Sequence, residues 1–394
     1  MLYRSIFELP YMTSTVSFTE FFGFDNPFSL APEEKEKIWA DQKELKENLE
    51  NIIKISLMTS PTKLIIYYGD WGSGKTHAMR YFTNEENLQN LFKPLHLSIP
   101  LTITLISPRN KVFETFYVKI VEGIYPKLVK AIKEIDSKVS PPRDPKFLRN
   151  ELDKYIKNKN LVKALSQVTN PRKEMQVEKY LLMTARSTEL DKLGVPRGIE
   201  TYTDMIETLS DIFTFLTELN ESRLRIIIWI DEGEHVFTMP SKDLLEFQAF
   251  LRDLIDHIPR NLLILINVSL RPGENVQDFI EYLGDPVKTR INRIIHSPEL
   301  KPEEAIQYVE DYFLAVGKNP FENKAIDYAL RIISKQAIDK KMALTPRLIN
   351  VAFSNILEIA YSESIKKITR EFIERIEDKL ISTTFSLFLT ESLL

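Results

Sequence analysis

A glycine-rich segment in the first quarter of the chain has the residue types and the spacing that phosphate binding requires. Gly69 is followed by four residues and then by Gly74, Lys75 and Thr76, which completes the pattern G-x-x-x-x-G-K-[ST]. Glycines let the backbone turn tightly, so that several N–H groups point into one anion-sized hollow. Lys75 would reach the β- and γ-phosphates, and Thr76 would place its hydroxyl on Mg²⁺. The residues expected to hold the nucleotide are Gly69, Gly72, Ser73, Gly74, Lys75, Thr76 and His77.

The flanking sequence has the strand and the helix that such a loop joins. Residues 64–68 form a short apolar, β-prone run, and the residues from Lys75 onward can open a helix whose dipole favours an anion. The alternative is a plain glycine turn, which would not need every fixed position of the pattern. We therefore predict that the chain binds a nucleoside triphosphate.

Two adjacent carboxylates, Asp231 and Glu232, close the clearest strand pattern of the chain, residues 225–232. A continuous apolar run is typical of a central parallel strand that is buried on both faces. Asp231 would hold Mg²⁺ directly or through water, and Glu232 would polarise the attacking water as a general base. The alternative is a strand that simply leaves the sheet into an acidic turn. Glu234 and His235 follow on that turn, where they could contact the nucleotide or Mg²⁺, although a surface role is more common.

Three further positions could contribute to catalysis. Asn267 or Ser269, at the end of the next apolar run, could hydrogen-bond the γ-phosphate or the lytic water, or could be ordinary polar residues at a strand exit. Arg290, with Arg293 as its competitor, could stabilise the transferring phosphoryl group in a neighbouring subunit, or could form a surface salt bridge. Arg347, in the first turn of a helix, could bring a helical lid onto the γ-phosphate or could cap its own domain. The predicted catalytic residues are Lys75, Glu232, Asn267, Arg290 and Arg347, and the predicted metal ligands are Thr76 and Asp231.

Five apolar runs separated by helical patterns indicate how these residues are positioned. Such alternation predicts a parallel sheet with both faces covered and right-handed crossovers. The carboxyl ends of its strands would bring the phosphate loop and the carboxylates to one edge. The expected strands are residues 64–68, 95–106, 225–232, 262–268 and 291–296.

The helical patterns lie before, between and after these strands. A helix is expected from Pro32 to about residue 57, and an insertion of helices from about 108 to 220, with breaks at Pro126, Pro141-Pro142, Asn170-Pro171 and Gly194–Pro196. Lys154, Lys157, Lys159 and Lys163 in this insertion could meet phosphates, although a solvated helix face is more common. Residues 1–31, which are rich in aromatic side chains, are expected to cover the following domain, or to form a partner-binding arm. From Pro298 to the end the pattern is helical.

Composition limits the class of protein. The 394 residues suffice for two or three domains, and a net charge of −4 implies no bulk attraction to nucleic acid. The absence of cysteine excludes disulfides and thiol chemistry, and the five scattered histidines do not favour a zinc site. No basic, apolar leader and no run long enough to span a bilayer is seen, so a cytoplasmic location is expected.

The order and spacing of these motifs resemble those of AAA+ ATPases. More narrowly, Asp285–Arg290 and Thr345–Arg347 look like the origin-recognition/initiator branch, and residues 180–196 with 247–252 are loosely similar to ATPases of phage-exclusion and mobile-element systems. The resemblance implies ATP as the nucleotide, with Asn267 as first sensor, Arg290 as finger and Arg347 as second sensor. It also implies that Ile38, Trp39 and Gln42 border the adenine. The insertion is longer than initiators carry, and only about 25 residues follow the lid, too few for the winged-helix domain of origin-binding members.

The sequence therefore predicts an α/β protein of the P-loop NTPase (AAA+) fold, a three-layer structure with a five-stranded parallel sheet, a helical insertion and a C-terminal α-helical lid. The expected divisions are an arm and helix at 1–60, a nucleotide-binding core at 61–299, the lid at 300–370 and a tail at 371–394. The expected function is ATP hydrolysis with Mg²⁺, in a homo-oligomer, to switch or remodel a nucleic-acid-associated assembly. The alternatives are a slow nucleotide switch of signalling or defence type that recruits proteins without DNA contact, and a ring that threads protein substrates.

Overall fold

The chain folds as two compact units, each assembled from segments that are distant in the sequence. The computed structural model describes residues 16–28, 38–40, 42–95, 97–108, 110–137, 146–219, 224–271, 273–322 and 324–391. One unit comprises Asn48–Gly69 and Phe82–His296, and the other comprises Met1–Glu47, Asp70–Tyr81 and Ser297–Leu394. The division cuts the chain where the first strand meets the phosphate loop.

The first unit contains a five-stranded sheet in the order β2-β3-β4-β1-β5. Its strands are β1 (Lys63–Asp70), β2 (Leu101–Ile106), β3 (Ile226–Asp231), β4 (Leu262–Leu270) and β5 (Ile291–Ser297). Strand β3 pairs in parallel with β2 and β4. In this register Ile226 lies opposite Leu101 of β2 and Leu262 of β4. The predicted parallel sheet of five strands is confirmed.

Helices bury the central strands. All six residues of β3 are buried, as expected for a strand covered on both faces. The long helices α5 (Val112–Ser137), α10 (Tyr202–Glu218) and α11 (Ser241–His257) pack on one another and share a hydrophobic core with β2, β3 and β4. This unit also contains α4 (Glu85–Phe92), η2 (Lys93–Leu95), η3 (Gly233–Thr238), α12 (Val276–Lys288) and most of α2 (Lys43–Met58). Helix α3 (Lys75–Thr83) belongs mainly to the other unit, which includes Asp70–Tyr81.

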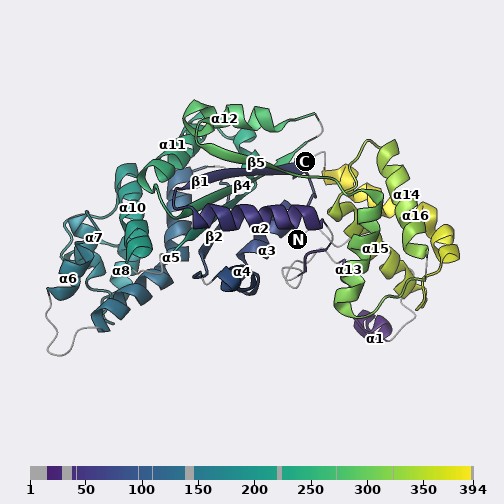
Figure 1. Cartoon of the computed structure of the whole chain (residues 1–394), viewed down its shortest axis with the longest axis horizontal. Coiled ribbons are helices and arrows are strands. Elements are labelled where there is room, and N and C mark those ends of the chain that lie inside the picture. Colours follow the sequence, from purple (N-terminus) through teal and green to yellow (C-terminus); the bar gives the residue numbers. More distant parts are fainter. Residues whose placement is uncertain are drawn as a thin grey trace. The chain divides into compact units, whose positions relative to one another are not determined.

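The helical insertion predicted between the second and third strands is present. After α5 come the short helices α6 (Phe147–Leu152), α7 (Lys159–Leu165), α8 (Glu174–Leu181) and α9 (Ser187–Leu193), and Figure 1 shows α6 to α8 beyond the end of the sheet. The predicted break at Pro126 is wrong, since α5 continues through it. Buried residues on both sides, Ile124 and Leu128, keep the apolar stripe continuous, and this packing outweighs the hydrogen bond that proline cannot donate. The breaks at Asn170-Pro171 and Gly194–Pro196 are confirmed, and Pro141-Pro142 lies outside the described residues.

Two expected boundaries are corrected. The helix expected from Pro32 begins at Lys43; Gln42 has a left-handed φ of 47°, which interrupts a helix, and Pro32 itself lies outside the described residues. The strand expected from residue 95 begins at Leu101. Pro100, just before it, has no N–H group to donate to a neighbouring strand.

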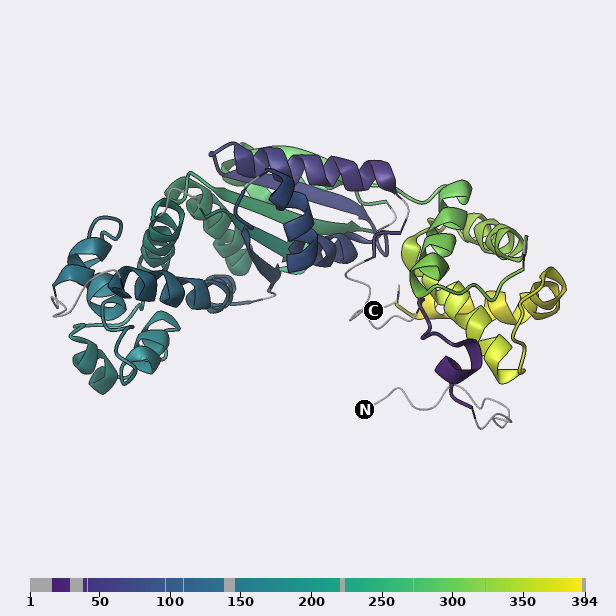
Figure 2. The same cartoon turned by 60° about the horizontal axis from the view of Figure 1, so that its bottom comes forward.

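The second unit is a helical bundle of α13 (Pro302–Val316), α14 (Ala325–Asp339), α15 (Pro346–Ser362) and α16 (Arg370–Glu391). Helix α16 packs on α14 and α15, so residues expected to form a separate tail belong to this bundle up to Glu391. Helix α1 (Phe18–Phe22) lies against the same bundle (Figures 1 and 2). The nearby Phe28 ring packs 5.2 Å from Phe313, centroid to centroid. Among the described residues, no helix is both long and apolar enough to cross a membrane.

Candidate functional site

The phosphate loop leads from β1 into the first turn of α3. Gly72 and Gly74 have φ values of +83° and +94°, a left-handed conformation that glycine adopts without steric cost. The Lys75 side chain is buried along the loop, and its ammonium donates to the carbonyl of Asp70 at 2.8 Å and to Oγ of Ser73 at 3.1 Å. These bonds hold a buried cation at the loop backbone, where the chemistry of phosphate binding needs it. Thr76 is exposed as the second residue of α3.

His77 brings the predicted adenine-bordering residues to this loop. Its Nε2 lies 2.9 Å from the carbonyl oxygen of Ile38, and its ring lies 6.0 Å from that of Trp39. The Trp39 ring is also 5.2 Å from Tyr81 on α3. Gln42 turns elsewhere and donates to the carbonyl of Pro298 at 3.2 Å. The structure therefore gathers His77, Ile38 and Trp39, and places the side-chain amide of Gln42 on a different partner.

Arg347 lies directly on the phosphate loop. It is the second residue of α15, and its backbone N–H donates to the carbonyl of Gly72 at 3.3 Å. The N-cap of this helix is Thr345, whose side chain accepts from the N–H of Leu348. Proline at the first helical position and threonine before it are the sequence features that start the helix at this point.

At the end of β3, Asp231 is held by Asn267 from the neighbouring strand β4. The side-chain amide of Asn267 donates to Oδ1 of Asp231 at 2.9 Å, and its oxygen accepts from Nε1 of Trp229 at 2.7 Å. All three side chains are buried. Burial of an unpaired carboxylate is costly, and these bonds lower that cost while fixing its direction.

Glu232 leaves the strand in a strained conformation. Its φ of 56° and ψ of 39° lie in the left-handed region, which a residue with a side chain rarely adopts and which costs about 1–3 kcal/mol. The next residue must be small, because a Cβ on Gly233 would lie 2.7 Å from the carbonyl oxygen of Asn267. The carboxylate of Glu232, about half exposed (49%), lies 3.2 Å from Nε2 of His235. This turn therefore directs Glu232 away from the strand and toward a histidine.

The residues that follow have structural partners. His235 Nδ1 lies 2.7 Å from the carbonyl oxygen of Ser107 at the end of β2, which orients the imidazole beside Glu232. Glu234 accepts from the backbone N–H of Ser269 at 2.9 Å and so ties the turn to β4. A surface role was expected for His235, yet its side chain is only 16% exposed. The sequence carried no signal for this, because the contact depends on the pairing of β2 with β3.

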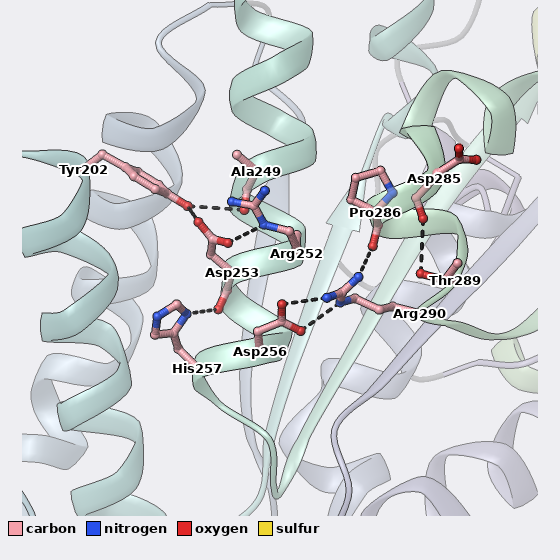
Figure 3. Close-up of polar contacts among 10 residues, drawn as sticks. All are labelled: Tyr202, Ala249, Arg252, Asp253, Asp256, His257, Asp285, Pro286, Thr289 and Arg290. Atoms are coloured by element: carbon pink, nitrogen blue, oxygen red, sulfur yellow. Dashed lines mark hydrogen bonds and ion pairs between the residues drawn. The ribbon is translucent and has the colours of Figure 1, made fainter.

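Arg290 is engaged in a bidentate ion pair (Figure 3). Its Nε and Nη2 donate to the two carboxylate oxygens of Asp256 on α11, at 2.8 and 2.6 Å, and Nη1 donates to the carbonyl of Pro286. This is the salt bridge weighed as the alternative to a finger. Arg293 lies on β5 and is exposed.

The same helix carries a second polar cluster that joins it to α10 (Figure 3). Tyr202 donates to the carboxylate of Asp253, which also accepts from Nε of Arg252 at 2.5 Å. Burial would raise the pKa of Asp253, but the hydrogen bonds from Arg252 and Tyr202 hold it below its usual value. Burial and the same carboxylate raise the pKa of Tyr202, which stays protonated. The two clusters join the insertion, α11 and the turn before β5 by side-chain bonds.

Comparison with known families identifies one match. The model of the KAP family P-loop domain matches residues 43–254, which spans the phosphate loop, the insertion, the Asp231-Glu232 turn and most of α11. No curated protein matches the sequence.

Solved structures match nearly the whole chain at low identity. The ORC2 protein of Aeropyrum pernix, solved as ADPNP–ADP complexes, is 13% identical, with a TM-score of 0.53 over 92% of this chain and 72% of that one. Drosophila ORC bound to DNA is 12% identical, with a TM-score of 0.52 over 95% and 68% of the two chains. CDC6P from Pyrobaculum aerophilum is 12% identical, with a TM-score of 0.50 over 87% and 68%. The resemblance to origin-recognition AAA+ ATPases is thus confirmed at the level of the fold.

Proposed function

This chain belongs to the KAP family of P-loop domains and is a nucleotide-binding P-loop NTPase, and we propose that it hydrolyses ATP with Mg²⁺, as an oligomer, to switch or remodel a nucleic-acid-associated assembly. The observation that carries the proposal is the combination of a complete phosphate loop with the Asn267–Asp231–Trp229 bonds at the end of β3. A carboxylate held this firmly beside a polar side chain of the next strand suits a metal and a sensor.

We infer that the nucleotide carries Mg²⁺, because the types of the residues present suit that ion. Mg²⁺ retains several waters and is held in nucleotide sites by one or two protein oxygens together with phosphates. In the described part of the chain, no group of three or more histidine, aspartate or glutamate side chains is placed to hold a metal by itself. The proposed ligands, the Thr76 hydroxyl and the Asp231 carboxylate, supply the small set that a nucleotide-borne Mg²⁺ needs. When bound, the ion would neutralise charge that develops on the phosphates.

The residues of the chain divide the work of hydrolysis. Lys75 would bind the β- and γ-phosphates, and Glu232 would accept a proton from the attacking water. His235, 3.2 Å from Glu232, would hold that carboxylate in position. Asn267 and Arg347 would sense the γ-phosphate, and Arg290 would act in a neighbouring subunit after leaving Asp256.

A nucleic-acid partner is supported by charge that is segregated in the insertion. Residues 146–200, which contain α6 to α9, carry twelve lysines and arginines and seven aspartates and glutamates, although the whole chain has a net charge of −4. Lys154 and Lys159 are neutralised by Glu151 and Asp153 at 2.6 and 2.8 Å. No ion pair with a described carboxylate is found for Lys157 or Lys163. Cations of this kind attract phosphate backbones and make binding depend on salt.

The test of this function is ATP turnover with and without duplex DNA, together with mass measurement of the ATP-bound state. Binding of a labelled duplex would be compared for the wild type, Lys157→Glu/Lys163→Glu and the control Lys335→Glu/Lys379→Glu on the helical bundle. We expect DNA to stimulate turnover, and we expect only the insertion variant to lose affinity and to lower the salt slope by about 2. If the wild type hydrolyses ATP but neither it nor either variant binds the duplex, the nucleic-acid role is contradicted.

One alternative has its own support. Lys75 and Glu232 each have partners within the protein, which suits a nucleotide switch that turns over rarely. Slow turnover that DNA does not change, with a partner protein bound only in the ATP state, would favour that function.

A further inference from the structure

The phosphate loop carries an aromatic side chain that phosphate binding does not explain. Trp71 occupies one of the four variable positions between Gly69 and Gly74. In such loops the backbone N–H groups and the lysine bind the phosphates, so the chemistry sets no requirement for an indole there. Trp71 is nevertheless 41% exposed, which offers a large apolar surface to the surroundings of the loop.

The indole face of Trp71 is used by Arg347. The guanidinium carbon of Arg347 lies 3.9 Å from the centroid of the Trp71 ring. Tryptophan has the best π face for a cation, and the contact becomes stronger as the pair is shielded from solvent. The delocalised, weakly hydrated guanidinium stacks better than a lysine ammonium would.

The backbones bring the two side chains to this distance. The N–H of Arg347 bonds to the carbonyl of Gly72, and a Cβ on Gly72 would lie 2.8 Å from Cβ of Arg347. The hydroxyl of Ser297, at the end of β5, also holds the loop, because it donates to the carbonyl of Ser73 at 3.1 Å. The first turn of α15 therefore contacts the loop backbone at Gly72, where there is no room for a side chain.

We propose that Trp71 is a positioning residue for Arg347, holding its guanidinium at the phosphate loop, from where it engages the γ-phosphate of bound nucleotide. This rests on the proposed role of Arg347 in sensing that phosphate. Ordering a long arginine side chain costs conformational entropy, and stacking on the Trp71 ring restricts the rotamers of the Arg347 side chain. Trp71 removes part of this cost before the nucleotide binds.

The inference predicts a dependence on the π face and not on bulk. Trp71→Phe keeps an aromatic face, whereas Trp71→Leu keeps apolar volume without one. We expect Trp71→Leu and Trp71→Ala to lower kcat about three- to tenfold, and Trp71→Phe to retain most of it. Calorimetry should show the same order in the affinity for a non-hydrolysable ATP analogue relative to ADP, since only the former has the γ-phosphate. The melting temperatures of the three Trp71 variants should stay near that of the wild type, because the Trp71 side chain is exposed.

A double-mutant cycle decides whether the effect passes through Arg347. In the Arg347→Ala background, Trp71→Ala should cause no further loss of kcat or of ATP-over-ADP preference. Losses that multiply, or a Trp71→Leu variant equal to Trp71→Phe, would overturn the inference. A wild-type chain that binds nucleotide without turnover would contradict the proposed hydrolysis instead, and the calorimetric cycle would still decide the role of Trp71.

Discussion

The amide of Asn267 on β4 donates a 2.9 Å hydrogen bond to the carboxylate of Asp231 on β3. Its orientation follows from the indole of Trp229, which can only donate and therefore faces the amide oxygen at 2.7 Å. The NH₂ group must then point at Asp231. One buried asparagine thus aligns the predicted metal ligand from the interior of the sheet.

Asn267→Ala should weaken both stability and hydrolysis. It leaves the N–H of Trp229 without a partner in the core, which costs about 1–3 kcal/mol, and it frees the carboxylate of Asp231. We expect a lower urea midpoint and slower ATP turnover, whereas Asn150→Ala, on the surface of α6, should change neither. An Asn267→Ala protein with unchanged turnover would remove Asn267 from the catalytic set.

Lys75→Ala should abolish nucleotide binding. The substitution removes the buried ammonium that the loop holds at the carbonyl of Asp70. Isothermal calorimetry with ATP and Mg²⁺ checks this, with the exposed Lys93→Ala as the matched control. If the affinity of the Lys75 variant equals that of the wild type, the loop assignment is wrong.

Glu232→Gln should bind ATP but hydrolyse it about 10²-fold more slowly or worse, as expected for the loss of a general base. Glutamine keeps the size of the side chain, so the strained turn should be unaffected. Single-turnover assays beside binding measurements separate the two steps, and Glu207→Gln on α10 serves as the control. Normal hydrolysis would mean that another group activates the water.

Arg290→Ala and Asp256→Asn break the same ion pair but leave different charges. The pair is partly exposed, with side-chain exposures of 28% and 43%, so its loss should cost at most about 1 kcal/mol. If Arg290 acts on a neighbouring subunit, only Arg290→Ala should lose turnover, and mixing it with Lys75→Ala subunits should restore part of it. If the two variants have equal ATP turnover and mixing restores none of it, the role of Arg290 is limited to the salt bridge with Asp256.

Asp204→Asn should destabilise the protein in a pH-dependent way. Burial would raise the pKa of Asp204, but hydrogen bonds from Thr201 and Glu200 and the charge of Arg197 hold it below its usual value. A lowered pKa stabilises the fold above the unfolded-state value of about 3.9, and this is lost as the pH falls through the lower folded value.

We therefore expect a loss of about 1–2 kcal/mol at pH 7 that shrinks below about pH 4. Urea unfolding at several pH values measures it, with the exposed Asp191→Asn as control. A difference from wild type that is constant with pH would show that the charge of Asp204 contributes nothing.

The sequence alone determined the sheet and its phosphate loop, since both depend on local information. A short continuous run of β-branched and aromatic residues such as Ile226–Ile230 favours a buried strand, and the glycines with Lys75 and Thr76 match the phosphate-loop pattern. Boundaries were less certain. The proline in α5 and the late start of α2 depended on long-range packing and on a single left-handed residue, which local preferences do not show.

The partners of each side chain were decided only by the tertiary structure. Trp229 and Asn267 are 38 positions apart, and Trp71 and Arg347 belong to opposite ends of the chain, so no periodic pattern links them. Arg290 pairs with Asp256 because α11 and the turn before β5 lie side by side in the fold. The sequence provides the polar and charged side chains. Which of them are in contact depends on the crossovers of the sheet and on the packing of α15 against the phosphate loop.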